Sequence, residues 1–581
     1  MGMIVTIEIT SRAPFVGGAS FGAVGAYERL DGVAIGELDP TDPANRGIVN
    51  LAKAPRNARG RVEYRSDICI LRPMDAAKGN GRILYEVNNR GRIMLFANLC
   101  AGKVGNQPAT AADLGNALPL KRGFTLVWSG WDAGAPRANG GLGLEAPVAT
   151  DGGAPITRRI REEFISGSRG GVLEQFRLSH EAASRDDAVL TVRRTQTAPR
   201  RAVAFGFVDA RTVRLAEGAP ELGSIYELRY SATDPKVLGI GFAATRDLIS
   251  HLRASAEGRD LLGRQATHAL GFGISQAGRY LRDHLVQGFN QDEAGRHVFD
   301  GIYTHVAGIG RVFFNTPFAQ PGRTRTWHED HDFPEIEYPF ATAAGDVKII
   351  ESNTSTEYWQ KGASLLHTDG TRDVALPPNV RGFFMAGTQH GGKAGMPRDA
   401  GPCINPRNWH DPMPAVRALL VALDEWVAEG REPPESRLPR IADNTLVKAD
   451  AVAWPKVAGL VPPWAANDVV ALDDWTDPKA PAQTWQALVP QVDADGNEIA
   501  GVRLPDIAVP TGMFTGWNLY QDPMPHGELA DREGTFLAFG DQRYPSKDAY
   551  VVRVQEVVAA LQRDRLLLDD DAAAYLQRAR Q

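Results

Sequence analysis

The chain has 581 residues, of which 43% are hydrophobic and 23% charged, and it carries a formal net charge of −6. This length exceeds one ordinary compact core, so we expect two or more domains or one elaborated domain. The acidic balance implies no basic face and argues against nucleic acid as a partner. No apolar run approaches the length of a membrane span, so we expect no membrane partner either.

The N-terminus and the cysteines bear on where the protein works. Residues 1–10 (MGMIVTIEIT) lack the basic and apolar regions of a signal peptide and alternate like a strand. The three cysteines, Cys69, Cys100 and Cys403, are odd in number and widely spaced, which suits a reducing compartment. We therefore expect a cytoplasmic protein.

The first part of the chain is predicted to be β-rich. Residues 1–80 contain short alternating stretches between Gly, Pro and Asn turns, which indicates an N-terminal region of strands packed on the core. The runs 82–87 (RILYEV) and 124–128 (FTLVW) are mainly apolar and end in turn residues. Parallel strands buried on both faces have this character, so residues 81–132 are expected to begin an α/β core.

This pattern is interrupted between residues 133 and 233. A Gly/Pro-rich loop leads into β-type alternation, clearest in 225–230 (IYELRY), which predicts an inserted β-subdomain. Helical order returns at Asp234-Pro235, where an aspartate N-cap followed by proline predicts a helix start. The α/β core is expected to continue over residues 234–430.

Residues 270–279 (LGFGISQAGR) are the most informative stretch of the chain. They indicate a buried strand, a tight turn with Ser275 at its apex, and then a helix. Gly273 and Ala277 flank the serine in a G-x-S-x-A variant of the G-x-S-x-G nucleophile elbow. Small residues at these positions let strand and helix approach closely, so the serine hydroxyl is expected to stand exposed at the catalytic edge of a sheet.

The remaining segments complete the predicted architecture. Further strands are expected at 302–306, 347–350 and 380–386, and a helix at 415–429. Residues 311–345, rich in Phe, Pro, Arg and His, predict a lid-like insertion, and residues 431–581 a C-terminal wrap that ends in two helices. Strands and helices that alternate around an elbow serine predict an α/β fold with a doubly wound, mostly parallel sheet. The serine would lie at the carboxyl edge of a central strand.

Three motifs resemble the α/β-hydrolase superfamily, and more closely a large bacterial group within it. The motifs are 271–279 (GFGISQAGR), 353–359 (NTSTEYW) and 386–391 (AGTQHG). The resemblance extends from about residue 5 to the C-terminus and implies a nucleophile, an acid and a base at Ser275, Glu357 and His390. Ala277 departs from the commoner glycine, but both residues are small.

Physical reasoning favours the same three residues. A serine hydroxyl needs an imidazole within hydrogen-bond reach to take its proton, and the imidazole needs a carboxylate on its other nitrogen. In this fold the order along the chain is serine, acid, histidine, each after a strand. Alternatives stay open: His390 could cap a turn, Glu357 could be a solvated helix residue, and Glu351, Asp346 and Asp369 are nearby carboxylates.

The oxyanion of the tetrahedral intermediate needs two hydrogen-bond donors. One is expected to be the backbone N–H of Gln276, directly after the nucleophile. The other is expected to be the backbone N–H of Asn89 or Arg90, in the loop 88–91 (NNRG) that follows the first core strand. An ordinary turn at this loop is the alternative.

Other signals are weaker. The stretch 328–332 (HEDHD) has metal-ligand residue types, but its spacing is not H-E-x-x-H, so no metal is expected. Gly271 and Gly273 resemble part of a dinucleotide fingerprint, but Gln276 stands at the third glycine position, so no cofactor is expected.

The leading hypothesis is therefore a carboxylic ester hydrolase that acts on a small-molecule ester through an acyl-serine. The alternatives are lactone, thioester or amide hydrolysis by the same residues, a nucleotide-dependent oxidoreductase, and a non-catalytic binding protein. The oligomeric state and the substrate cannot be read from the sequence.

Overall fold

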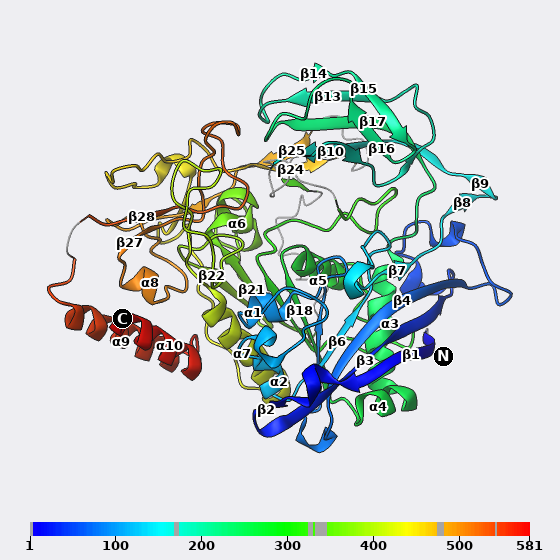
Figure 1. Ribbon diagram of the computed structural model, residues 1–581, viewed down its shortest axis with the longest axis horizontal. Helices are drawn as coiled ribbons and strands as arrows, with labels where there is room; N and C mark the ends of the chain where they lie inside the picture. The colour runs from blue at the N-terminus through cyan, green and yellow to red at the C-terminus, as the bar shows by residue number, and fades with distance from the viewer. Residues whose placement is uncertain are drawn as a thin grey trace.

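The computed structural model describes residues 4–167, 173–322, 346–472, 474, 481–540 and 543–581, together with the backbone of 329–331. A central sheet dominates it (Figure 1). In spatial order its strands are β1 (Ile4–Pro14), β3 (Gly25–Leu38), β4 (Val62–Pro73), β6 (Thr125–Ser129), β5 (Arg82–Glu86), β18 (His268–Ile274), β19 (Gly301–His305), β21 (Lys348–Thr354) and β22 (Val380–Met385).

The sheet is antiparallel at one end and parallel at the other. The pairs β1–β3, β3–β4 and β4–β6 are all antiparallel. From β6 through β5, β18, β19 and β21 to β22 every pair is parallel. The parallel strands are short and almost wholly buried, as the apolar runs predicted. The N-terminal strands thus continue the same sheet that carries the parallel core.

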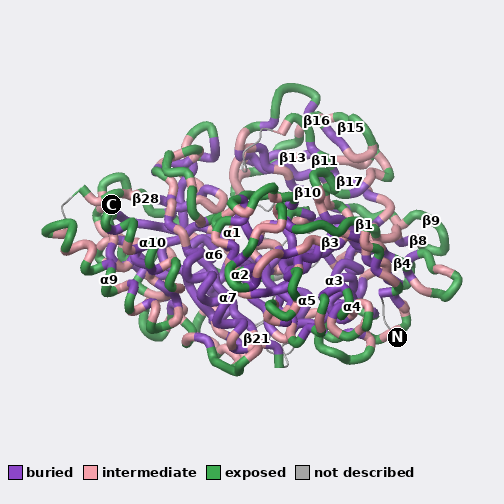
Figure 2. The backbone as a smooth tube through the Cα atoms, turned by 60° about the horizontal axis from the view of Figure 1, so that its bottom comes forward, coloured by how far each residue is buried: buried purple, intermediate pink, exposed green. Residues whose placement is uncertain are grey.

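Helices lie on both faces of this sheet and fill two cores. The larger helices are α1 (Leu95–Leu99), α3 (Ile240–Ala254), α4 (Ala256–Leu262), α5 (Gln276–Val286), α6 (Ser355–Gln360), α7 (Met413–Glu429), α9 (Lys547–Arg563) and α10 (Asp569–Arg580). Side chains of α3, α4 and α5 share one hydrophobic cluster with the sheet, and those of α1, α7, α9 and α10 share the other. Figure 2 shows the buried backbone concentrated around this assembly. The predicted α/β fold, with helices interleaved between mostly parallel strands, is confirmed in this part.

Residues between β7 (Leu144–Glu145) and α3 form separate antiparallel sheets, at the top of Figure 1. One contains β10 (Thr157–Ile165), β12 (Glu181–Ala182), β13 (Val189–Arg193), β14 (Arg201–Ala202) and β17 (Ile225–Thr233). The other contains β11 (Phe176–Arg177), β15 (Phe205–Asp209) and β16 (Thr212–Leu215). They enclose a hydrophobic cluster of their own, which includes Leu228 and Tyr230.

The C-terminal part has few regular elements before its two helices. It contributes β23 (Leu446–Val447), β24 (Val469–Leu472), β25 (Pro481–Trp485), β26 (Val489–Pro490), α8 (Pro505–Ala508), β27 (Gly512–Phe514) and β28 (Phe536–Ala538). In the described parts of the chain, no helix has the length and apolar character needed to cross a membrane.

The helix predicted from Asp234 begins at Ile240 instead: Asp234 has a left-handed φ of 55°, and Lys236 forms a β-bridge with Val148. Aspartate and proline favour turns as well as helix starts, and here the turn prevails. Most of the lid-like segment 311–345 lies outside the described residues; within it, the backbone of β20 (Glu329–His331) pairs with β24.

Candidate active site

Ser275 stands in a sharp turn between β18 and α5. Its backbone φ of 60° and ψ of −120° fall in a region that L-residues rarely adopt, and such strain is concentrated at functional sites. A Cβ on Gly273 would lie 2.5 Å from the backbone of Ala277, so only glycine allows the strand and the helix to pass this closely. The Ser275 N–H donates to the carbonyl of His305 on β19 at 2.8 Å, which fixes the turn to the next strand.

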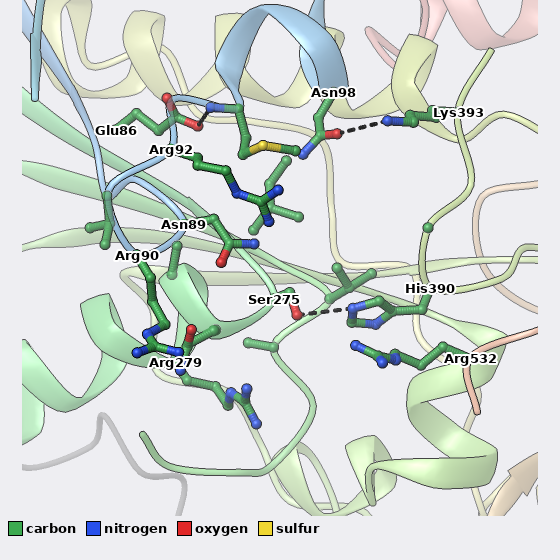
Figure 3. A pocket seen from close by; sticks show the side chains of 18 of the residues that line it. Glu86, Asn89, Arg90, Arg92, Asn98, Ser275, Arg279, His390, Lys393 and Arg532 are labelled. Atoms are coloured by element: carbon green, nitrogen blue, oxygen red, sulfur yellow. Dashed lines mark hydrogen bonds between the residues drawn. The ribbon is translucent and has the colours of Figure 1, made fainter. Parts of the chain in front are cut away.

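The structure brings Ser275, His390 and Glu357 together. His390 Nε2 lies 2.9 Å from Ser275 Oγ, and His390 Nδ1 lies 2.5 Å from Glu357 Oε1. The His390 N–H donates to Thr356 Oγ1 at 3.0 Å, so the histidine loop after β22 is tied to the first turn of α6. These contacts form one continuous hydrogen-bonded path from the hydroxyl to the carboxylate (Figure 3 shows its serine–histidine end).

Glu357 is fully buried but ionised. Burial alone would raise the pKa of its carboxyl, but the charge of His390 and hydrogen bonds from His390 and Thr354 hold the pKa below its ordinary value. Thr354 and Glu357 form a reciprocal capping box at the start of α6, in which the Thr354 N–H donates to Glu357 Oε2 at 3.0 Å. One carboxylate oxygen is thereby held by the helix cap, and the other faces the imidazole.

Two of the other carboxylates considered, Glu351 and Asp369, are engaged elsewhere. Glu351 Oε1 accepts hydrogen bonds from Arg282 Nη2 at 2.9 Å and from Thr304 Oγ1 at 3.0 Å. Asp369 accepts from Thr371 and Arg372 in its own turn. Of the acids considered, Glu357 is the one hydrogen-bonded to His390.

The loop after β5 faces the serine from the other side. Asn88 anchors it: its side chain donates to Ser129 O at 2.6 Å and accepts from the Gly91 N–H at 2.6 Å. The two backbone groups predicted as oxyanion donors already have acceptors, because the Asn89 N–H donates to Arg92 O at 2.8 Å and the Arg90 N–H to Asn88 O at 3.0 Å. The side chain of Asn89 lies in the cavity between Arg92 and Ser275 (Figure 3). Gln276, at the first position of α5, also lines the cavity.

A cavity of about 840 Å³ opens over Ser275. This volume is in the range of small-molecule sites. Its lining comes from the β5 loop, the elbow, the histidine loop and the C-terminal part, which contributes Asp531 and Arg532. Sequence reasoning did not find these last two residues, because no motif or periodicity marks them.

Glu498 is a second group that the sequence did not reveal. This buried residue accepts from Ser355 Oγ at 2.5 Å and from the Gly387 N–H at 2.6 Å. It thereby joins the start of α6 to the loop that carries His390. Burial raises the pKa of its carboxyl to about 7.

One of the weaker sequence signals concerns metal ligands. No group of His, Cys, Asp and Glu in the described residues could hold a metal ion, and the side chains of the stretch 328–332 lie outside these residues. The glycines of the elbow serve packing: a Cβ on Gly271 would lie 3.0 Å from the Leu281 side chain.

Comparison with known families agrees with this architecture. A family model described as "Alpha/beta hydrolase domain" matches residues 177–577, which is more than half of the chain. The protein therefore belongs to the α/β-hydrolase family, and this membership suggests that it is a hydrolase. No curated protein matches the chain. The matched range includes Ser275, Glu357 and His390 but not the loop that carries Asn89.

Proposed function

We propose that the protein is a serine-dependent carboxylic ester hydrolase that acts through an acyl-enzyme. The observation that carries this proposal is the unbroken path from Ser275 Oγ through His390 to the buried, ionised Glu357. A hydroxyl becomes a competent nucleophile when an oriented imidazole can accept its proton. All three side chains come from the carboxyl ends of parallel strands, where ligands of such sheets bind.

In this mechanism Ser275 Oγ attacks the ester carbonyl while His390 Nε2 takes the hydroxyl proton. His390 then delivers that proton to the leaving alcohol, and the acyl group stays on the serine. A water molecule, activated by the same imidazole, attacks the acyl-enzyme and releases the acid. Glu357 holds the Nδ1–H tautomer of His390 and stabilises the imidazolium that forms in each step.

The oxyanion is proposed to be held by the Gln276 N–H and by the side-chain amide of Asn89. The first position of a helix leaves its N–H without an intrahelical partner, which suits Gln276. Because the backbone N–H groups of Asn89 and Arg90 already have acceptors, the Asn89 side chain takes the role predicted for one of them. Asparagine side chains can supply such a donor.

The domain organisation fits a selective enzyme. We propose a catalytic core of residues 81–132 and 234–430, with the N-terminal strands, the β-insert of 133–233 and the C-terminal wrap of 431–581 built around it. The C-terminal wrap supplies Asp531 and Arg532 to the cavity, which supports its part in enclosing a substrate of modest size.

Labelling with a fluorophosphonate tests the proposal. The adduct should be found on Ser275 by mass spectrometry, and Ser275→Ala should prevent labelling and lower ester turnover by roughly 10⁵-fold or more. Ser11→Ala, at an exposed serine of β1, is the matched control and should leave both unchanged. A folded wild-type protein that takes no label on Ser275 and cleaves no ester in a panel of acyl and aryl esters would rule the proposal out.

A further inference from the structure

Most of the charged side chains that line the cavity over Ser275 are cations, although the chain as a whole carries a net charge of −6. Among the described residues, its basic lining residues are Arg90, Arg92, Arg279, Lys361, Lys393 and Arg532. The acidic ones in the same lining are Glu86 and Asp531. Like charges repel, so such a gathering is costly unless an anion is brought to it.

Of the two acidic side chains, one pairs with a lining cation and the other is mostly neutral near pH 7. Burial raises the pKa of Glu86 to about 8, so its carboxyl is mostly protonated near neutral pH. Asp531 pairs with its neighbour Arg532, whose Nε lies 3.1 Å from Asp531 Oδ1. Arg90 is paired with Asp132 at 2.6 Å.

Two cations remain available on the side of the β5 loop. Arg92 forms no ion pair with any of the described residues, and its side chain points into the cavity above Ser275 (Figure 3). Lys393, three residues after His390, donates to the neutral Asn98 Oδ1 at 3.4 Å. Figure 3 shows both on the same side of the serine as Asn98. Both line the cavity that contains Ser275, so each can contact an anionic group of a substrate bound there.

We propose that the substrate is an ester that also carries an anionic group, such as a carboxylate, and that Arg92 and Lys393 bind this group. The proposal rests on the ester hydrolase function proposed above and names its substrate class. A cleft lined by one sign of charge raises the local concentration of oppositely charged ligands. A charge-assisted hydrogen bond to a carboxylate is also stronger than one between neutral groups.

Binding to the Ser275→Ala protein tests this separately from catalysis. The probes are N-(4-nitrophenyl)adipamic acid and its neutral counterpart N-(4-nitrophenyl)hexanamide, measured by isothermal titration calorimetry at low salt. The anionic anilide should bind about tenfold more tightly or better, and added salt should weaken its binding while leaving that of the neutral anilide unchanged. Arg92→Gln and Lys393→Gln should each remove most of this preference.

Two exposed cations outside the cavity lining provide matched controls. Arg56→Gln and Lys547→Gln remove the same charge from the protein and should leave the preference intact. Equal affinity for the two anilides, or an equal loss with the control variants, would overturn the proposal whether or not the enzyme cleaves esters.

Turnover by the wild-type enzyme then gives a second readout. The ester 4-nitrophenyl hydrogen adipate should have a higher kcat/KM than 4-nitrophenyl hexanoate, and Arg92→Gln should close this gap mainly through KM. In a second pair, 4-acetoxybenzoate and phenyl acetate, the charge lies on the leaving group instead. For each ester, kcat/KM of the wild-type enzyme is compared with that of the Arg92→Gln enzyme. A preference for the anionic ester that depends on Arg92 in either pair supports the proposal. Measurable turnover without such a preference in either pair contradicts it. If the wild-type protein cleaves none of these esters but still binds the anionic anilide more tightly, the hydrolase function alone is ruled out.

Discussion

Two buried carboxyl groups, one on each side of the cavity, have pKa values shifted in opposite directions. On the triad wall, which is the side of the cavity formed by Ser275 and His390 of the proposed catalytic triad, Glu357 is buried behind the histidine. Its pKa lies below the ordinary value, because an imidazole and a helix cap offset the cost of burial. On the wall of the β5 loop, Glu86 is equally buried, but its neighbours are the Trp128 Nε1–H at 2.6 Å and the Met94 N–H at 3.2 Å. These neutral donors leave its pKa raised to about 8.

The difference shows that the partner, and not burial, decides the charge at this sheet edge. Both residues lie at the carboxyl ends of parallel strands or just beyond them. In the proposed mechanism, the ionised acid lies beside the imidazolium that it stabilises. The protonated acid lies where a negative charge would repel the oxyanion and the proposed anionic substrate. Each of the following substitutions changes one side of the cavity, and we expect it to leave the function of the other side unchanged.

Glu357→Gln should have the largest effect. The amide keeps the size of the side chain but no longer stabilises the imidazolium or fixes the right tautomer, so kcat should fall by roughly 10⁴-fold with little change in stability. The measurement is kcat on a 4-nitrophenyl ester, alongside urea unfolding.

Glu351→Gln is the matched control, because it changes the other glutamate of the same strand region. It removes the buried partner of Arg282, so the free energy of unfolding should fall by about 3 kcal/mol while kcat per folded molecule stays within a few-fold. The reverse pattern would transfer the acid role from Glu357 to Glu351.

Asn89→Ala tests the donor on the opposite wall. If its side-chain amide holds the oxyanion, kcat should fall by about 10²- to 10³-fold with KM nearly unchanged, because the contact forms only in the transition state. Asn98→Ala removes another amide from the same cavity lining and should change turnover of a neutral ester only a few-fold. Unchanged kcat in Asn89→Ala would return the role to a backbone N–H, after a rearrangement of the loop.

Gly273→Ala tests how tightly the triad wall is built. The added methyl group would meet the backbone of Ala277 at 2.5 Å, so the free energy of unfolding should fall by about 1–3 kcal/mol. Gly391, next to His390, has nothing within 4 Å of such a Cβ, and Gly391→Ala should change stability by less than about 0.5 kcal/mol. Equal stability of the two variants in urea unfolding would show that the elbow can relax.

The parts of the site that sequence predicts are those with a local steric or topological requirement. Ser275 is predictable because small neighbours are needed where a Cβ on the strand would lie 2.5 Å from the helix backbone. Glu357 and His390 were predicted because each follows a strand, and parallel strands end at one edge. The parallel half of the sheet followed from short apolar runs.

The parts that escaped prediction depend on long-range contacts or on competing local signals. Glu498 and Arg532 reach the site from a C-terminal segment with no periodicity, so only the folded chain places them. At Asp234 the same residue types favour a turn and a helix start, and tertiary pairing selected the turn. The sequence does not show which group of the β5 loop is the oxyanion donor. A backbone N–H that already donates to a carbonyl of its own turn cannot be told, from sequence alone, from one that has no acceptor.

Glu86→Gln should give the smallest effect, seen in the pH dependence of stability. The pKa of Glu86 is about 8 in the folded protein and 4.5 as its ordinary value, so its stabilising contribution is complete below the lower value and is lost as pH rises through about 8. Between pH 7 and pH 9 the wild-type protein should lose about 1 kcal/mol of unfolding free energy relative to Glu86→Gln, measured by urea unfolding at both values. Parallel pH profiles for the two proteins would mean that Glu86 is ionised at neutral pH, and the two walls would then carry like charges.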